Sequence, residues 1–449
     1  MTTVEELGSA TRTVSGRRLA ALVRERCQDA NLAHEVEVVS RVLPFKVSHH
    51  VIDHLVDWQS APDDPLYRLV FPHRDMLDPG HFGAVERALG DPPALRAVVA
   101  GIRGELNPHP GDQLTRNIPH HEGAELSGVQ HKYTQTALVF PRHGQTCHAY
   151  CSYCFRWAQF VGDPQLRMAD DGPQHVIRYL RAHPEVTDVL FTGGDPLVMH
   201  SARLKPYLDA LLEPGLEHVT TVRIGTKALS FHPARLVADP DAAGMLRLLE
   251  GVVRAGRSLA VMVHVSHPRE LRPDVTRRAV AALHGIGAQL WSQAPVVRHI
   301  NDDPQVWADA WRAQLALGIH PYYVFVERDT GARRYFGLPL RRVHEIYRDA
   351  VATVSGLGRT ARGPVMSTAE GKVVVDGVAE LPGGPAFVLR FLQARVPDLV
   401  GRPFHARFDP TAQWWSDLVP FSPYDRAFFP VRDEAGDAGA RPAAQAGPR

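Results

Sequence analysis

Between residues 136 and 327 the sequence alternates short apolar, β-branched runs with longer amphipathic stretches, and this alternation strongly limits the available folds. The expected strands are 136–140, 188–192, 219–224, 259–265, 289–293 and 322–327, and the expected helices are 174–182, 202–212, 242–253, 273–284 and 306–317. Strands that alternate with helices at this spacing form a parallel sheet with crossover helices. Six such units predict an α/β fold built on a partial, TIM-like (β/α)6 barrel, fewer than the eight units of a closed barrel.

The segments on either side of this region have different patterns of apolar residues. Residues 1–130 show apolar positions at helical spacing, interrupted by Pro/Asp-rich breaks, and predict a helical N-terminal region. The barrel is expected to span 131–335, and a C-terminal extension over 336–430, with one helix and a few short strands, is expected to complete the active site. Residues 431–449 are poor in large apolar side chains and are expected to be disordered.

The charge balance excludes several classes of protein. The 449 residues carry 50 Lys and Arg against 49 Asp and Glu, a net charge of +1, which argues against general binding to nucleic acid or to anionic membranes. No apolar run approaches the roughly 18 residues of a membrane span. The N-terminus has no basic-then-apolar signal pattern, so we expect a cytoplasmic protein.

Three of the four cysteines lie within eight residues of one another, directly after the first predicted barrel strand. In a reducing compartment such a group indicates metal or cluster ligation rather than disulfides. Cys147, Cys151 and Cys154 can hold a [4Fe–4S] cluster and leave its fourth iron open to a small molecule. Two alternatives remain, a zinc site completed by His148 and three unrelated core cysteines. Cys27 stands alone and is expected to be an inert core residue.

The cysteines belong to an ordered set of motifs between about residues 40 and 375. The motifs are FKVSHH (45–50), APDDPLYRLVFP (61–72), HKY (131–133), CxxxCxxCFR (147–156), DVLFTGGDPL (188–197), VRIGT (222–226), HVSHP (264–268), SQAPVVRHIND (292–302) and PYYVFVE (321–327). In this order they resemble the radical S-adenosylmethionine (SAM) superfamily, and within it the lysine 2,3-aminomutase family.

The resemblance implies where SAM binds. In the superfamily the open iron chelates the amino and carboxylate groups of SAM, and an electron from the cluster then releases a 5′-deoxyadenosyl radical. The resemblance assigns the SAM amino group to the segment Gly193-Gly194-Asp195-Pro196. It makes Arg223, Thr226 and Gln293 candidates for the SAM ribose and carboxylate, and His264 and His267 candidate cavity residues. We expect these positions at strand ends, on the carboxyl-end face of the barrel.

The resemblance also raises the question of pyridoxal 5′-phosphate (PLP), which the aminomutases hold as a Schiff base with a lysine in a glycine-rich run. The best match is the STAEGK segment, which keeps one glycine and Lys372. Lys132 and Tyr133 match the phosphate-binding pair, but Thr136 stands where the family has a second arginine, and a threonine cannot replace that bidentate contact. The alternative is that Lys372 is a solvated turn residue. The family's C-terminal zinc cysteines are absent, since no cysteine follows Cys154.

Three positions bear on the substrate. Arg156 matches the family arginine that binds the α-carboxylate of the amino acid. In the lysine enzyme two aspartates receive the distal ammonium; by alignment the first falls on Arg328 and the second near Val365. Losing both acids removes the attraction for a cation. We therefore expect an anionic or neutral polar distal group, as in a glutamate-like substrate. If the alignment slips by one residue, Asp329 takes the acid's place, and Arg328 could also be a surface residue paired with Glu327 or Asp329.

The resulting hypothesis is a radical SAM enzyme that catalyses a 2,3-amino migration on a non-lysine amino acid. One alternative is a PLP-independent dehydrogenase, epimerase or other rearrangement enzyme with an amino-acid-derived substrate. A second is a non-catalytic homologue that binds the cluster. The resemblance also implies an electron donor such as flavodoxin or ferredoxin, and a homo-oligomer.

Overall fold

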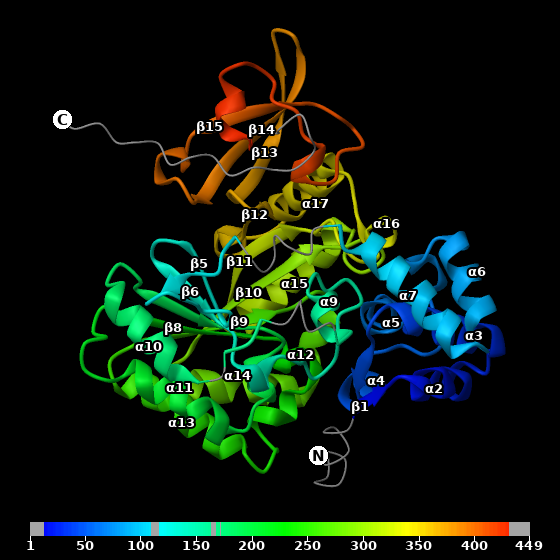
Figure 1. Ribbon diagram of the computed structural model, residues 1–449, viewed down its shortest axis with the longest axis horizontal. Coiled ribbons are helices and arrows are strands. Elements are labelled where there is room, and N and C mark those ends of the chain that lie inside the picture. The colour runs from blue at the N-terminus through cyan, green and yellow to red at the C-terminus, as the bar shows by residue number, and fades with distance from the viewer. Residues whose placement is uncertain (1–12, 109–115, 163–167, 171, 431–449) are drawn as a thin grey trace.

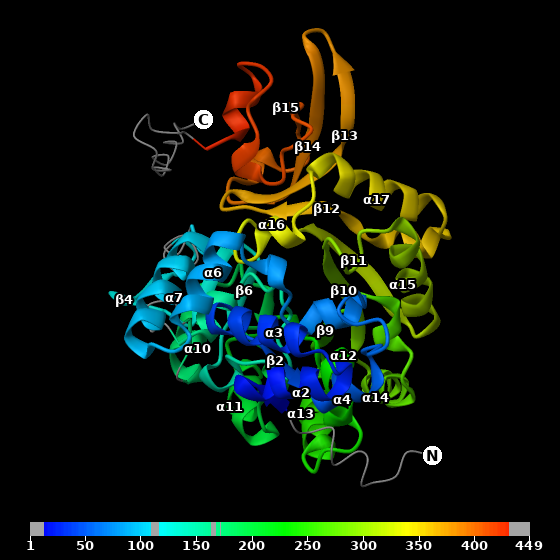
Figure 2. The ribbon, with the colours of Figure 1, turned by 90° about the vertical axis from the view of Figure 1, so that its right-hand side faces the viewer.

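The computed structural model describes residues 13–108, 116–162, 168–170 and 172–430. The predicted disordered tail, 431–449, lies outside these residues. The sheet runs through the middle of the molecule, with the N-terminal helices beside it and the C-terminal strands beyond one end (Figures 1 and 2).

The N-terminal region is mainly helical as far as Leu106. Its elements are β1 (Thr13–Ser15), α2 (Arg17–Cys27), α3 (Ala30–Val42), β2 (Lys46–Ser48), α4 (His49–His54), α5 (Pro65–Val70), α6 (Pro79–Ala88) and α7 (Pro92–Leu106), followed by the short strands β3 (His120–His121) and β4 (Ala124–Glu125). Asp64, Asp78 and Asp91 each accept hydrogen bonds from the first turn of a helix that starts with proline. The Pro/Asp-rich breaks in the sequence are therefore helix N-caps.

The predicted barrel strands are all present, as consecutive neighbours in a parallel arrangement. They are β6 (Thr136–Val139), β7 (Asp188–Phe191), β8 (Thr221–Thr226), β9 (Ser258–His264), β10 (Gln289–Val296) and β11 (Ile319–Val326). The predicted crossover helices are α10 (Pro173–Ala182), α11 (Ser201–Leu211), α13 (Ala242–Arg254), α14 (Asp274–Gly285) and α15 (Pro304–Ala316). Shorter helices α9 (Trp157–Phe160), α12 (Ala228–Phe231) and α16 (Arg333–Phe336) lie in the loops. The partial (β/α) barrel is confirmed.

The C-terminal extension continues the same sheet, which the sequence pattern did not predict. After α17 (Leu340–Ala352), strand β12 (Arg362–Ser367) pairs with β11 as a seventh parallel strand. Strands β13 (Gly371–Leu381), β14 (Gly384–Ala394) and β15 (Pro403–Arg407) follow in this order, and each pairs antiparallel with the strand before it. The prediction of short strands was wrong for β13 and β14, which have 11 residues each. With β5 (Val129–Tyr133) antiparallel at the other edge, the open sheet has 11 strands.

The apolar cores explain how the cysteine loop is held. One core fills the space between strands β6–β11 and their helices, and includes Phe191 and Leu249. A second core joins the N-terminal helices to the loop after β6, since Tyr153 and Trp157 are buried in it with side chains such as Tyr67. The loop that carries the cysteines is thus packed between the barrel and the N-terminal helices. In the described part of the chain, no helix has the length and apolar character needed to cross a membrane.

Candidate active site

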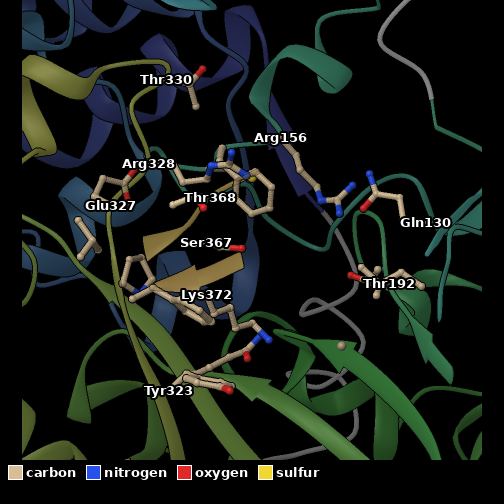
Figure 3. A pocket seen from close by; sticks show the side chains of 18 of the residues that line it. Gln130, Arg156, Thr192, Tyr323, Glu327, Arg328, Thr330, Ser367, Thr368 and Lys372 are labelled. Carbon is tan, nitrogen blue, oxygen red and sulfur yellow. The ribbon is translucent and has the colours of Figure 1, made fainter. Parts of the chain in front are cut away.

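A single cavity of about 1730 Å³ occupies the interior of the partial barrel and is closed on one side by the C-terminal extension (Figure 3). Its lining includes side chains from the cysteine loop, from β5 to β11 and from the hairpin β13–β14. Cavities for one small ligand typically measure roughly 300–1,000 Å³. This cavity therefore has room for more than one ligand at a time.

The three clustered cysteines line this cavity together. The backbone of their loop is anchored to the N-terminal region: the Tyr150 N–H donates to the Lys46 carbonyl, and the Ser152 N–H donates to the Leu69 carbonyl, each at 2.8 Å. The three cysteines therefore share one cavity, and Cys151 also packs against the N-terminal apolar core. Cys27 ends α2 and packs against the N-terminal core, away from the cavity lining.

The electrostatics of the cysteines fit a ligand that displaces protons. Burial raises the pKa of Cys151 to about 12 and that of Cys154 to about 11, and it also raises the pKa of Cys147. Without a metal the thiols hold their protons, so metal binding must release them.

The arrangement does not resemble a site for one metal ion. Among the described residues, no three His, Cys, Asp or Glu side chains form a group that could hold a single ion. His148 lies against His232, with ring centroids 4.9 Å apart, and its buried Nε2 has no hydrogen-bond partner among these residues. In a [4Fe–4S] cluster each thiolate binds a different iron, so the sulfurs need not converge on one point. The three cysteines therefore fit a cluster better than a zinc ion.

The two glycines of the GGDP segment allow two loops to touch. A Cβ on Gly194 would lie 2.2 Å from the carbonyl oxygen of Thr146, the residue before Cys147. Gly193 has a φ of +136°, and a Cβ there would lie 2.3 Å from the Gln145 side chain. The Asp195 N–H donates to the Thr146 carbonyl at 2.7 Å. Only glycine permits this approach, so the segment fixes the start of the cysteine loop as well as lining the cavity.

Asp195 and Thr226 bind each other across the ends of β7 and β8. The Thr226 hydroxyl donates to the Asp195 carboxylate at 2.8 Å, and the Lys227 N–H donates to the same group at 2.9 Å. Both side chains are buried and line the cavity. Their polar atoms are thus already used in joining the two strand ends. Pro196 starts a 3₁₀ turn (Pro196–Val198) and does not belong to the cavity lining.

Three other predicted positions lie elsewhere than expected. Arg223 and Gln293 line the cavity, but both are within strands, because β8 begins and ends two residues later than predicted and β10 extends to Val296. The Arg223 guanidinium binds Asp188 at the start of β7 through Nε at 2.8 Å and Nη2 at 2.6 Å. His264 lines the cavity, whereas His267 lies outside its lining and caps the 3₁₀ helix Pro268–Leu271.

Lys372 lies in β13 and its side chain lines the cavity. The alternative that it is a solvated turn residue is therefore wrong. Its Nζ donates to Gln393 Oε1 at 2.6 Å, and it lies 5.2 Å from the ring centroid of Tyr133 and 4.9 Å from that of Tyr323. Burial, followed by the charges of Arg223 and Arg362, lowers the pKa of Lys372 to about 7. An amine with this pKa has a substantial unprotonated fraction near neutral pH, as covalent chemistry at nitrogen requires.

Lys132 and the 368–371 turn lie close to Lys372. Lys132 Nζ donates to the Thr368 carbonyl, and burial, followed by the charges of Arg395 and Arg328, lowers its pKa to about 7. The turn itself is closed: the Thr368 N–H donates to the Gly371 carbonyl at 2.8 Å, and the Gly371 N–H donates to Thr368 Oγ1 at 3.2 Å. These two N–H groups are therefore already used within the turn.

Arg156 and Arg328 lie at the opposite end of the view from Lys372 (Figure 3). Their guanidinium carbons are 5.3 and 5.2 Å from the ring centroid of Phe155, and Arg328 also lies 5.7 Å from that of Trp414. Within the described residues, no carboxylate forms an ion pair with Arg156. Burial lowers the pKa of Arg156 to about 10, so it stays charged at neutral pH. Two cations thus approach one aromatic ring inside the cavity.

The neighbours of Arg328 and the position of Val365 bear on the alignment with the two aspartates of the lysine enzyme. Glu327 lines the cavity, and burial holds the pKa of its carboxyl well above the usual range. Asp329 is buried and also lines the cavity. Val365 is fully buried against Tyr323 and does not belong to the cavity lining. Its alignment with the second aspartate therefore says nothing about the substrate.

Sequence reasoning missed several residues of the cavity, namely Asp188, Tyr323, Gln393 and Trp414. Asp188 lies in the DVLFTGGDPL motif and Tyr323 in the PYYVFVE motif, so both could have been identified as candidates from the sequence. Gln393 and Trp414 come from the C-terminal extension, where only the pairing of β13 with β14 places Gln393 opposite Lys372. That register is not readable from composition or periodicity.

Comparison with known proteins identifies the family. A putative L-lysine 2,3-aminomutase of Aquifex aeolicus (strain VF5) is 30% identical over 388 residues, which cover 86% of this chain and 90% of that protein. The chain belongs to the lysine 2,3-aminomutase family. It is therefore an enzyme of a radical SAM isomerase class.

Other members of this family are also similar to the chain. L-lysine 2,3-aminomutase of Escherichia coli (strain K12) is 27% identical over 276 residues, 61% of this chain and 74% of that protein. Glutamate 2,3-aminomutase of Clostridioides difficile (strain 630) is 29% identical over 234 residues, 49% of this chain and 52% of that protein. No family model matches the chain.

Solved structures are similar only over parts of the fold. A radical SAM methyltransferase from Sphaerobacter thermophilus has a TM-score of 0.37 and 14% identity, and covers 52% of this chain and 68% of its own. SuiB of Streptococcus suis, solved with S-adenosylmethionine, has a TM-score of 0.34 and 13% identity, and covers 60% of this chain and 56% of its own. Overlaps of this size carry no argument about the site.

Proposed function

We propose that this aminomutase-family enzyme moves the α-amino group of a glutamate-like amino acid to the neighbouring carbon, with a [4Fe–4S] cluster, SAM and PLP. The observation that carries the proposal is the pair of guanidinium groups, Arg156 and Arg328, on one ring of a buried cavity. A dicarboxylate offers each of them an anion, whereas lysine would bring its ammonium to a cation.

The chain's own residues fit the cluster and SAM. Cys147, Cys151 and Cys154 would hold three irons, since their thiols face one cavity and coordination would remove their raised-pKa protons. The fourth iron would face the space beside Gly194 and Asp195, which also line the cavity. When bound, cluster and SAM supply a radical that abstracts hydrogen from an unactivated carbon. A protein electron donor such as flavodoxin or ferredoxin would supply the electron.

The fit to PLP rests on Lys372 and Lys132. Burial lowers the pKa of both amines to about 7, so near neutral pH Lys372 can present its unprotonated form for covalent attachment and Lys132 its ammonium form to the phosphate. Tyr133 adds an aromatic wall, 5.2 Å from the Lys372 nitrogen. When bound, PLP supplies the conjugated system through which an amino group can migrate. The protein's part is to orient the substrate nitrogen and exclude water around it.

Arg156 and Arg328 divide the recognition of the substrate. Arg156 would bind the α-carboxylate, because it follows the last cluster cysteine by two residues and lines the same cavity as the three cysteines. Arg328 would bind the distal group, held in place by Phe155 and Trp414.

The decisive experiment measures SAM cleavage and β-amino acid formation with glutamate, glutamine, lysine and arginine. Glutamate or glutamine should turn over fastest, and Arg328→Asp should lower the preference for glutamate over lysine by about tenfold or more, since a like-charge contact replaces an attraction. Arg334→Asp is the matched control, because the Arg334 side chain is 88% exposed and lies outside the cavity lining. Lysine turning over fastest in the unchanged enzyme would overturn the substrate assignment.

A second candidate function is favoured by the closed turn at 368–371. The Thr368 and Gly371 N–H groups already donate hydrogen bonds within the turn, so they are not available to bind a phosphate. Without PLP the enzyme would abstract hydrogen and end in dehydrogenation, epimerisation or another rearrangement. Hydroxylamine release of PLP from the purified protein separates the two candidates. If fully active enzyme contains no PLP, the second candidate takes first place.

A further inference from the structure

The nitrogen of Lys372 has a defined partner on the neighbouring strand. Lys372 and Gln393 face each other in the register of β13 and β14, and Lys372 Nζ donates to Gln393 Oε1 at 2.6 Å. Both side chains line the cavity. An amide oxygen accepts one N–H and carries no charge, so it orients an amine without favouring the ammonium form.

The charged groups around Lys372 do not supply a counter-ion either. Asp188, on β7, accepts a hydrogen bond from Arg223 Nε, on β8, at 2.8 Å and forms an ion pair with Arg223 Nη2 at 2.6 Å. From β12, the guanidinium of Arg362 lies 5.0 Å from the ring centroid of Tyr323. Arg223 and Arg362 both lower the pKa of Lys372, and only Asp188 opposes them.

Groups on two further strands, β5 and β11, also face the Lys372 amine. Lys132, on β5, adds a further cationic group, since the charges of Lys132 and Lys372 repel each other. The rings of Tyr133, on β5, and Tyr323, on β11, contact the amine. Burial raises the pKa of both phenols, to about 12 for Tyr323, so neither becomes an anion near neutral pH. Among these groups only Asp188 is an acid; another acid nearby, Glu370 in the turn before β13, lines the cavity and forms an ion pair with Arg116, with Nη1 and Oε1 3.7 Å apart.

We propose that Gln393 is a positioning residue that orients the Lys372 amine, and that an amide is required at this position because a carboxylate would favour the ammonium form of the lysine. The inference deepens the proposed function, which gives this amine its use in holding PLP. Figure 3 shows Lys372 extending from its strand towards Tyr323 in the cavity. The amine state itself can be measured without PLP.

The test is competitive acetylation of PLP-free protein with a trace of acetic anhydride between about pH 6 and pH 10. Mass spectrometry of the Lys372 peptide then gives the midpoint of its reactivity. The exposed Lys205 serves as an internal reference in every sample. Gln393→Glu places a carboxylate beside the amine, and Gln289→Glu makes the same change at an exposed position of β10, outside the cavity lining.

We expect a midpoint near pH 7 in the unchanged protein and after Gln289→Glu. Gln393→Glu should raise the midpoint by at least about one pH unit, so that acetylation near pH 7.5 falls about tenfold. Gln393→Leu should keep the low midpoint, because burial remains, but should slow the borohydride trapping of added PLP on Lys372. An unchanged midpoint after Gln393→Glu, or normal trapping after Gln393→Leu, would overturn the proposal.

The two proposals fail in different ways. If the purified enzyme neither retains PLP nor needs it, while the midpoints behave as expected, the PLP role fails and the positioning role of Gln393 stands. If PLP is retained through Lys372 but Gln393→Glu leaves the midpoint in place, the proposed function stands and the positioning role fails.

Discussion

At the scale of single residues, Cys147, Cys151 and Cys154 all line one cavity, whereas Cys27 lies outside its lining. We predict that Cys147→Ala, Cys151→Ala and Cys154→Ala each lower the iron content of anaerobically reconstituted protein to a small fraction, because each removes a cluster ligand. Cys27→Ala is the control and should keep its iron, since Cys27 packs in the N-terminal core. Iron and sulfide analysis decides the matter, and loss of iron from the Cys27 variant would contradict the assignment.

Other residues show where sequence reasoning stops. Arg223 and Gln293 were expected at strand ends, but a two-residue shift of β8 and a longer β10 place them within strands. Strand ends are set by loop geometry and by neighbouring strands, neither of which periodicity reports. Gln393 could not be paired with Lys372 from sequence, because the pairing depends on the register of a hairpin.

At the scale of elements, the contact between the GGDP segment and the start of the cysteine loop makes a sharp prediction. Gly194→Ala forces a Cβ within 2.2 Å of the Thr146 carbonyl oxygen, so the loop before Cys147 must shift. We expect a loss of roughly 1–3 kcal/mol in the free energy of unfolding, together with a lower iron content. Urea unfolding and iron analysis test both.

A second glycine provides the control for this substitution. Gly251 lies in α13, and a Cβ there would meet no atom within 4 Å. Gly251→Ala should leave the iron content unchanged and stabilise the protein by up to about 1 kcal/mol, because alanine favours the helix. Equal effects of the two substitutions would show that the loop contact is unimportant.

The order of the strands β6–β11 followed from the sequence because a strand-helix alternation has few solutions. The continuation of the sheet through β12 to β15 did not, because no helix separates β12 from β13 and the pattern there is compatible with a separate small sheet. The sequence therefore predicted the segment that carries Lys372 only as a C-terminal extension, and it did not predict that β13 and β14 form one side of the cavity.

At the scale of the whole molecule, the buried amine affects stability in a pH-dependent way. The folded-state pKa of Lys372 is about 7, against a usual value of 10.5, so the unfolded chain binds more protons between these two values. Stability therefore rises with pH across this window, and the cost of the lysine is largest near and below its folded pKa. We predict that Lys372→Met raises the free energy of unfolding near pH 7 by on the order of 3 kcal/mol while abolishing turnover.

The comparison between variant and unchanged protein isolates this contribution from other titrating groups. The difference in unfolding free energy should shrink as the pH rises from about 7 to about 10. Urea unfolding at several pH values measures it. A difference that does not depend on pH would show that Lys372 keeps its proton in the folded protein.

Because β12 to β15 belong to the same sheet as the barrel strands, a chain truncated before β13 would lose part of that sheet. Until β13 has paired, β12 presents the open edge of a buried parallel strand, with unsatisfied N–H and C=O groups along its length. A chain that ends before Gly371 would therefore not behave as a smaller enzyme. It would expose the unpaired edge of β12 and self-associate through it. Nascent or proteolysed copies should therefore accumulate in aggregates or be bound by chaperones.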